Sequence, residues 1–100
     1  MPDHLHQLVR GEILRALSIQ LPYAMSEIVL ASHLERLGIG VPPTILAAHM
    51  LYLREKDYIV SEHVEDRSIE RWMHRLTPKG TDLIEGNIAA DPGIHTPRHS

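Results

Sequence analysis

One hundred residues, 43% of them apolar, are enough for one domain with a single core and leave no room for a second domain. Cysteine is absent, which excludes disulfides and thiolate metal sites, so stability must come from packing. The formal net charge of −3 disfavours strong non-specific attraction to DNA phosphates, so any DNA binding must depend on local basic clusters.

The first third of the chain predicts two helices. Apolar residues recur every three or four positions from 5 to 21, the period of an amphipathic helix, and Pro22 limits that helix. Ser26 is a suitable N-cap for a second helix with an apolar stripe over 29–37. Gly38 can take the left-handed conformation that ends such a helix, and a tight connection follows it.

A third helix is predicted from Pro43, because proline in the first turn removes only an amide that lacks an intrahelical partner. Its core stripe is Leu46, Met50 and Leu53, and it ends near 56–57. Residues 58–65 and 69–76 then predict two strands of a hairpin, with a polar turn over 65–68.

Thr77 and Pro78 supply an N-cap and a first helical residue for a short last helix that ends near Glu85. We therefore expect a mainly α (α+β) winged helix-turn-helix domain over residues 1–86, with three helices, a two-stranded β-hairpin wing and a short C-terminal helix. Residues 87–100 offer little to bury and are expected to form a flexible tail.

Local sequences also carry a resemblance. LREKDYIV (53–60) resembles the end of a recognition helix and its turn into the wing, and LTPKGTDLI (76–84) resembles the wing-to-helix junction of MarR-, PadR- and ArsR-like proteins. Asp57 departs from the pattern, because these families usually have glycine at that place.

Nearly the whole chain is similar to small ArsR-like proteins encoded by Mu-like phages and prophages. The matching segments are EILRAL (12–17), LERLGIGVPP (34–43), LYLREKDYIV (51–60), Trp72, LTPKGTDLIEG (76–86) and PGIHTPR (92–98). The resemblance implies a winged-helix fold and a phage setting, and it brings no catalytic residues.

The third helix is a poor surface for reading bases, because bidentate recognition of base edges needs Arg, Lys, Asn or Gln. Only Thr44, His49 and Tyr52 could hydrogen-bond to DNA there. Ile45, Ala48 and Tyr52 instead form an apolar stripe that suits a protein partner, unless the first helix or the wing covers it as core.

Basic residues gather on the predicted wing. Arg67, Arg71 and Arg75 share the parity of one strand face, with Lys79 just beyond, and such a stripe could hold phosphates. Alternatively, these arginines pair with the nearby acids, which are Glu62, Glu65, Asp66 and Glu70. Trp72 and Leu76 have the opposite parity, so Trp72 is expected to anchor the wing in the core.

Eight histidines do not predict a metal site, because no three or four follow a recognisable ligand spacing. His33 falls on the apolar stripe of the second helix and is expected to be a core or boundary residue with satisfied hydrogen bonds. No enzyme motif is present, so neither catalysis nor a cofactor is expected.

Two functions remain open. The first is a phage-encoded regulator of transcription, or a genome-handling factor, that binds double-stranded DNA. We expect it to act as a homodimer, because one such domain buries little surface on DNA. The second is a protein-protein interaction module in a phage or host complex, without DNA binding. No apolar run is long enough for a signal peptide or a membrane span, so the bacterial cytoplasm is the expected location.

Overall fold

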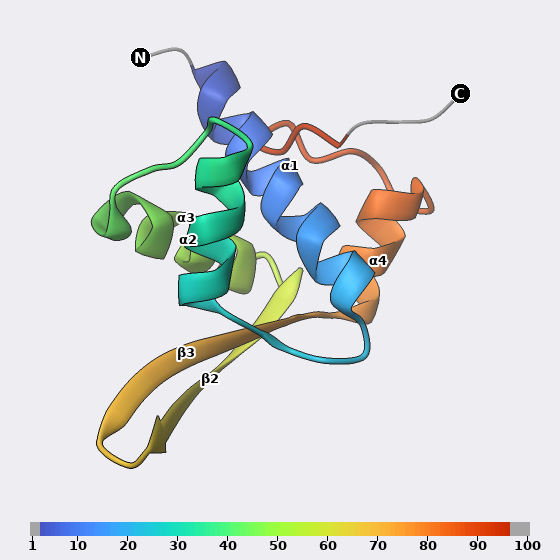
Figure 1. Cartoon of the computed structure of the whole chain (residues 1–100). Helices are drawn as coiled ribbons and strands as arrows, with labels where there is room; N and C mark the ends of the chain where they lie inside the picture. Colours follow the sequence, from blue (N-terminus) through green and yellow to red (C-terminus); the bar gives the residue numbers. More distant parts are fainter. Residues whose placement is uncertain (1–2, 97–100) are drawn as a thin grey trace.

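The computed structural model describes residues 3–96, and its helices and hairpin form the predicted winged helix-turn-helix. Three helices and a short fourth one make the body of the molecule, and the hairpin projects from it as a wing (Figure 1). The elements are α1 (Asp3–Gln20), β1 (Met25–Ser26), α2 (Glu27–Arg36), α3 (Pro43–Glu55), β2 (Ile59–Asp66), β3 (Ile69–Leu76) and α4 (Pro78–Glu85).

The helix ends are set by the predicted capping residues. The Ser26 hydroxyl accepts a hydrogen bond from the Val29 amide at 3.2 Å, and Gly38 has a φ of 79° just after α2. The Thr77 hydroxyl accepts from the Gly80 amide at 3.0 Å at the start of α4. Local sequence therefore determines where these helices begin and end.

Asp57 takes over the role of the glycine that it replaces. Its φ is 65°, in the left-handed region that aspartate tolerates better than most residues. The Thr77 hydroxyl donates to the Asp57 carbonyl at 2.5 Å, which links the exit of α3 to the start of α4. The departure from the family pattern therefore leaves the turn into the wing intact.

The sheet has one more strand than predicted and a tighter turn. β1 pairs with β3, so the antiparallel order is β1-β3-β2. Arg67 and Ser68 have φ values of 51° and 69°, the pattern of a two-residue turn whose twist matches the flanking strands. Arg67 lies in the turn, within the predicted range 65–68, and therefore does not share a strand face with Arg71 and Arg75.

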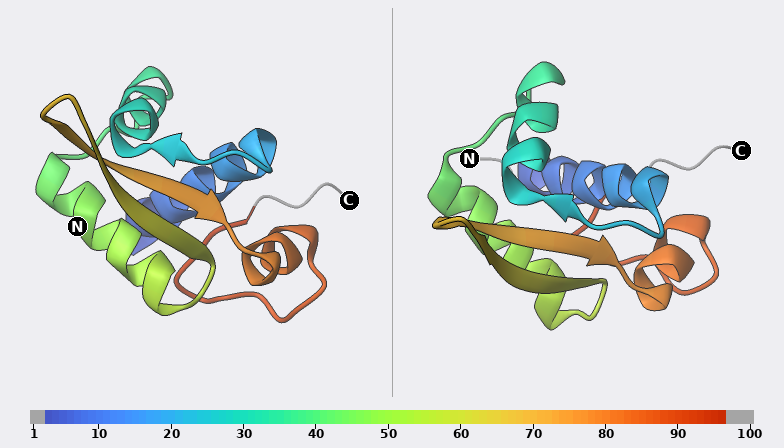
Figure 2. Two further views of the ribbon diagram at one scale, coloured as in Figure 1. Left: turned by 90° about the horizontal axis from the view of Figure 1, so that it is seen from below. Right: turned by 60° about the horizontal axis from the view of Figure 1, so that its bottom comes forward.

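One core joins all the helices and the base of the hairpin. Its α1 residues are Val9, Ile13, Leu14, Ala16 and Leu17, and α1 runs through the body between α2 and α4 (Figure 2). The other buried apolar residues are Leu30, Leu34, Leu46, Met50, Leu53, Tyr58, Ile59, Leu76, Leu83 and Ile94. The predicted α3 stripe is therefore core.

The expectation that residues after Gly86 have little to bury is wrong for part of that segment. Ile94 is only 5% exposed and belongs to the core, and the His95 amide donates to the Gln7 carbonyl at 3.0 Å. Gly11 makes room for this contact, because a Cβ there would overlap the His95 carbonyl. Residues 97–100 of the predicted tail lie outside the described residues.

Gly11→Ala tests this close approach. Alanine in mid-helix normally stabilises by roughly 0.5–1 kcal/mol relative to glycine, but here its Cβ must displace the backbone at His95, so we expect destabilisation by about 1–3 kcal/mol. Chemical denaturation measures the change, and hydrogen exchange should show lost protection of the His95 amide. Ser32→Ala, at an exposed helical position, is the control and should change neither. A Gly11→Ala protein as stable as the parent would contradict the packing described.

Candidate nucleic-acid interface

The exposed face of α3 is mostly apolar. Because Leu46, His49, Met50 and Leu53 point into the body, the opposite face is open to solvent. It presents Pro43, Thr44, Ile45, Ala47, Ala48, Leu51, Arg54 and Glu55. Ile45 is 37% and Leu51 is 45% exposed. Thr44 is thus the one exposed member of the three predicted hydrogen-bonding candidates.

His49 is buried and not available to DNA. The residue is 3% exposed, and its ring contacts two residues of α1, His6 and Arg10. Arg10 Nε donates to His49 Nδ1 at 3.1 Å, so the neutral ring carries its proton on Nε2, which is 3.2 Å from His6 Nδ1. Burial, followed by the positive charge of Arg10, lowers the pKa of His49 to about 4. The prediction that His49 contacts bases is therefore wrong, because the α3 periodicity alone did not show that this flank packs on α1.

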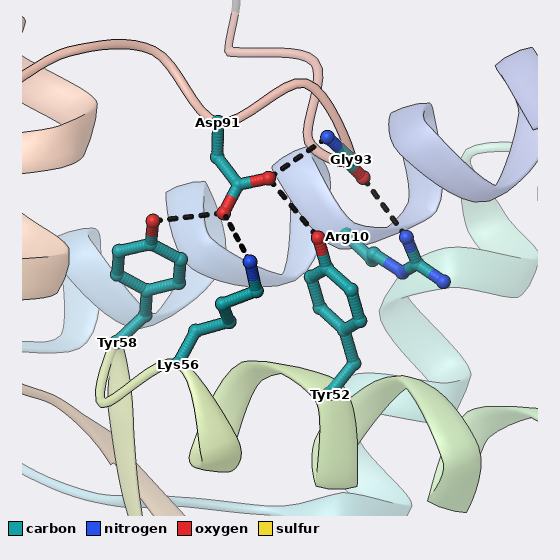
Figure 3. A network of polar contacts seen from close by, with 6 residues as sticks. All are labelled: Arg10, Tyr52, Lys56, Tyr58, Asp91 and Gly93. Atoms are coloured by element: carbon teal, nitrogen blue, oxygen red, sulfur yellow. Dashed lines mark hydrogen bonds and ion pairs between the residues drawn. The ribbon is translucent and has the colours of Figure 1, made fainter.

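Tyr52 is partly buried, and its hydroxyl is bound by the segment that follows α4. Its hydroxyl donates to Asp91 Oδ1 at 3.0 Å, and the Tyr58 hydroxyl donates to Asp91 Oδ2 at 2.8 Å (Figure 3). The Arg10 guanidinium stacks 3.9 Å from the Tyr52 ring centroid and donates to the Gly93 carbonyl at 3.0 Å. Tyr52 is therefore covered, but not by α1 alone or by the wing alone. Ile45 and Ala48, the other two residues of the predicted apolar stripe, stay exposed.

Asp91 is the centre of that network. Burial by itself would raise the pKa of this carboxyl, but the Gly93 amide, the two tyrosine hydroxyls and the charge of Lys56 outweigh burial and lower the pKa. Lys56 Nζ lies 3.7 Å from Asp91 Oδ2. Burial and the same carboxylate raise the pKa of Tyr58 to about 12, which keeps its hydroxyl protonated as a donor. The carboxylate thereby ties the C-terminal segment to α3.

The outer face of the wing carries two of the predicted arginines. Arg71 pairs with Val64 across the strands and Arg75 pairs with Val60, so both project from one face. Arg71 Nη2 lies 3.8 Å from Asp66 Oδ2, an exposed ion pair of small strength. Arg67 lies at the turn. Among residues 3–96, Arg71 is the one of the three with such an acidic partner, so the predicted pairing with acids holds for Arg71 alone, and phosphate binding by the three arginines stays a prediction.

Lys79 lies apart from that outer face. It is exposed in the first turn of α4, with its Nζ 5.4 Å from the Tyr58 ring centroid. This places it next to the Asp91 network and not in line with Arg71 and Arg75. Lys79 therefore extends the basic surface only around the base of the wing.

The inner face of the wing corrects the prediction for Trp72. Leu76 and His74 are buried, but Trp72, farther out on β3, is 43% exposed. Its ring contacts the His63 ring at 5.0 Å between centroids and lies 5.8 Å from the Arg54 guanidinium. Trp72 is too far along the hairpin to reach the core, so it lines the space between the wing and α3.

His74 is a buried polar anchor that sequence reasoning missed. Its Nε2 lies 2.9 Å from Glu27 Oε1 and its Nδ1 lies 2.7 Å from the Ser61 hydroxyl. Burial lowers the pKa of His74, so the neutral ring donates to the carboxylate and accepts from the hydroxyl. Two strands and the start of α2 are joined by this one side chain. The sequence signal that could have found His74 is its position two residues before Leu76, which places both side chains on the same face of the strand.

Arg54 is the second residue that was missed. It is exposed on the flank of α3 that faces the wing, where it borders a small hollow together with Ala47, Trp72 and His74. The stripe of Leu46, Met50 and Leu53 alone does not tell which free flank of α3 the wing covers. Besides Thr44, α3 therefore offers Arg54, whose guanidinium can form bidentate hydrogen bonds with base edges or phosphates.

The histidines do not assemble a metal site in residues 3–96, where no three His, Asp or Glu side chains could hold one ion together. His33 is partly buried at the boundary of the core, as expected, but its Nε2 lies 3.6 Å from Glu12 Oε1 and has no hydrogen-bond partner. The expectation of a satisfied ring is therefore wrong. Across the same described residues, no helix is both long and apolar enough to cross a membrane.

Asp91→Asn tests the network. Because the folded-state pKa of Asp91 is lowered, its carboxylate contributes stability that is present above the unfolded pKa of about 4 and is lost as the pH falls through the folded value. Thermal unfolding should show the parent protein more stable than Asp91→Asn at neutral pH, with the gap closing below about pH 4. Glu55→Gln, which removes an exposed carboxylate of α3, should matter little at neutral pH. A gap that widens on acidification would refute the assignment.

Solved structures share this fold with the chain. A candidate transcriptional regulator from Thermoplasma acidophilum superimposes with a TM-score of 0.68 at 21% identity, over 81% of this chain and 75% of its own. A PadR family transcriptional regulator from Eggerthella lenta superimposes with a TM-score of 0.60 at 26% identity, over 75% of this chain and 67% of its own. No family model and no curated protein matches the sequence. The chain has the winged helix-turn-helix fold of these transcriptional regulators.

Proposed function

We propose that this chain is a winged-helix regulator of transcription that binds double-stranded DNA. The observation that carries the proposal is the pairing of an open α3 with a wing whose outer face bears Arg71 and Arg75. The description of structural neighbours as transcriptional regulators supports the same function. In this arrangement α3 enters the major groove while the wing contacts the flanking backbone.

The wing supplies most of the affinity in this proposal. Arg67 at the turn and Arg71 and Arg75 on the outer face bind phosphates, and Lys79 adds a charge near the base. Thr44 and Arg54 are the polar groups that α3 offers to base edges or to the backbone. With so few donors on α3, we expect modest sequence discrimination, and two domains in a homodimer would supply the surface that one domain lacks.

The proposal also includes the biological setting in which the protein acts. The resemblance to proteins of Mu-like phages supports a role in controlling or handling a phage genome inside a bacterial host. A regulator of that kind acts in the host cytoplasm and needs no cofactor for its chemistry, since DNA binding makes and breaks no covalent bond.

Salt dependence tests the role of the wing. We expect the affinity for a labelled random-sequence duplex, measured by fluorescence anisotropy, to fall steeply between about 50 and 200 mM salt. Arg71→Ala and Arg75→Ala should each weaken binding and reduce the slope of log K against log salt by about 0.9. Arg15→Ala, in an ion pair with Glu12 on α1, is the charge-matched control and should leave the slope unchanged. A parent protein that binds no duplex at low salt would refute the proposal.

A second candidate function is protein binding by α3. The exposed apolar face at Ile45, Ala47, Ala48 and Leu51 favours it, because such a surface in a regulator often receives another protein. Tyr52 no longer belongs to the candidate surface, since its hydroxyl binds Asp91.

Ile45→Asp/Leu51→Asp tests this alternative. If α3 binds a second copy or another protein, the double variant should dissociate the oligomer or the complex in analytical ultracentrifugation while keeping the fold by circular dichroism. Ile19→Asp, which charges an exposed apolar residue at the end of α1, is the control. An oligomeric state and partner binding that persist in the double variant would exclude α3 as the interface.

A further inference from the structure

A groove of about 370 Å³ separates α2 and the start of α3 from the wing. That volume is at the lower end of the range of small-molecule sites. Its lining residues come from three elements and the connection before α3: Glu27, Ile28, Ala31, Ser32, Glu35, Val41, Pro43, Leu46, Glu70, Arg71 and Trp72. Arg71 is the one lining residue that also belongs to the proposed DNA-binding surface, and no residue of the Asp91 network lines the groove.

The walls of the groove are apolar and include a large aromatic ring. Ile28 is 67% exposed, and Trp72 is the single tryptophan of the sequence. Val41 and Pro43, from the connection before α3 and from its first turn, supply further apolar surface. Leaving an indole and an isoleucine in water is unfavourable, so an apolar body that covers them gains free energy of binding.

The charges around the groove are mainly negative. Glu27, Glu35 and Glu70 all line it, against a single cation, Arg71. The Arg71 guanidinium has an ion-pair partner outside the lining, because it lies 3.8 Å from Asp66. Arg54 lies in the neighbouring hollow, on the α3 side of Trp72. A phosphate or carboxylate would be repelled here, whereas a positive charge would be attracted.

We propose that this groove binds a small amphipathic organic cation, an ammonium or guanidinium group carried by an apolar body. The carboxylates of Glu35 and Glu70 attract the charge, and the Trp72 ring contacts the cation or the apolar body. Glu27 contributes less, because its carboxylate is already bound to His74, whereas the Glu70 carboxylate is exposed and has only a longer contact, 3.9 Å to His63 Nε2. Arg71 is shared with the proposed DNA-binding surface, but the attraction of a cation rests on Glu35, Glu70 and Trp72, none of which that surface uses.

The emission of Trp72 reports directly on the groove. Titration with benzyltrimethylammonium should change the fluorescence in a saturable way, whereas benzyl alcohol should bind several-fold more weakly and benzenesulfonate should not bind. Glu35→Gln and Glu70→Gln should each weaken binding of the cation by about fivefold at low salt. Glu55→Gln, exposed on α3 outside the lining, is the matched control and should bind as the parent does.

Thermal stabilisation by the same three compounds gives a readout that does not need the indole. It should follow the same order in the parent and be reduced in Trp72→Phe. Equal binding of the cation and the alcohol, preference for the sulfonate, or absence of a response to the cation at millimolar concentrations would each overturn the proposal. Binding of polylysine without binding of the small cation would also overturn the proposal, because the groove would then bind a basic polypeptide chain.

Discussion

The burial of one face of α3 is the constraint on which the rest of the structure depends. Leu46, Met50 and Leu53 enter the common core, and His49 packs on α1 beside them. Every functional surface of the molecule is defined relative to this helix, because its free face, its wing-side flank and its flank toward the C-terminal segment have different chemistry. If α3 were turned about its own axis, different residues would occupy those three surfaces.

Polar contacts at both flanks hold α3 in that rotation. On one side, Asp91 accepts hydrogen bonds from the hydroxyls of Tyr52 and Tyr58. These bonds join α3 and the residue before β2 to the segment after α4. Across the sheet, His74 is bound by Ser61 and Glu27, which holds the wing against α2. Both central groups are buried and fully engaged, and such networks favour a single arrangement over many. These contacts join α3 and the base of the wing to the same body of the molecule.

Charge is distributed so that two neighbouring surfaces suit different ligands. The outer face and turn of the wing carry arginines, while the groove between the wing and α2 carries three carboxylates against one arginine, Arg71, around an apolar lining. A net charge of −3 is therefore compatible with local attraction of phosphates, because the acidic residues are partly gathered elsewhere. The same separation explains why the basic wing and the acidic groove are assigned to different partners.

The helices and the hairpin could be predicted from the sequence because their signals are local. Ser26, Thr77 and the prolines before α3 and in α4 act within a turn of their own positions, and the apolar period of α3 identifies its core stripe. The short strand β1 was missed, because it has only two residues, of which Ser26 is also the N-cap of α2, and two residues carry no strand pattern. Trp72 was wrongly placed in the core, because parity tells which face a side chain is on but not how far along the wing the core extends.

The sequence by itself determined the order of elements, the helix ends and the basic character of the wing, since all of these depend on neighbouring residues. Only the tertiary structure decided that His49 and Tyr52 are engaged inside the protein, that Ile94 joins the core and that Arg54 borders the wing. Each of those facts depends on contacts between residues well separated in the chain: 39 positions for Arg10 with His49 and for Tyr52 with Asp91, 83 for Arg10 with Gly93, and 18 for Arg54 with Trp72. Periodicity carries no information at that range, because the packing of whole elements, and not the local chain, brings such residues together.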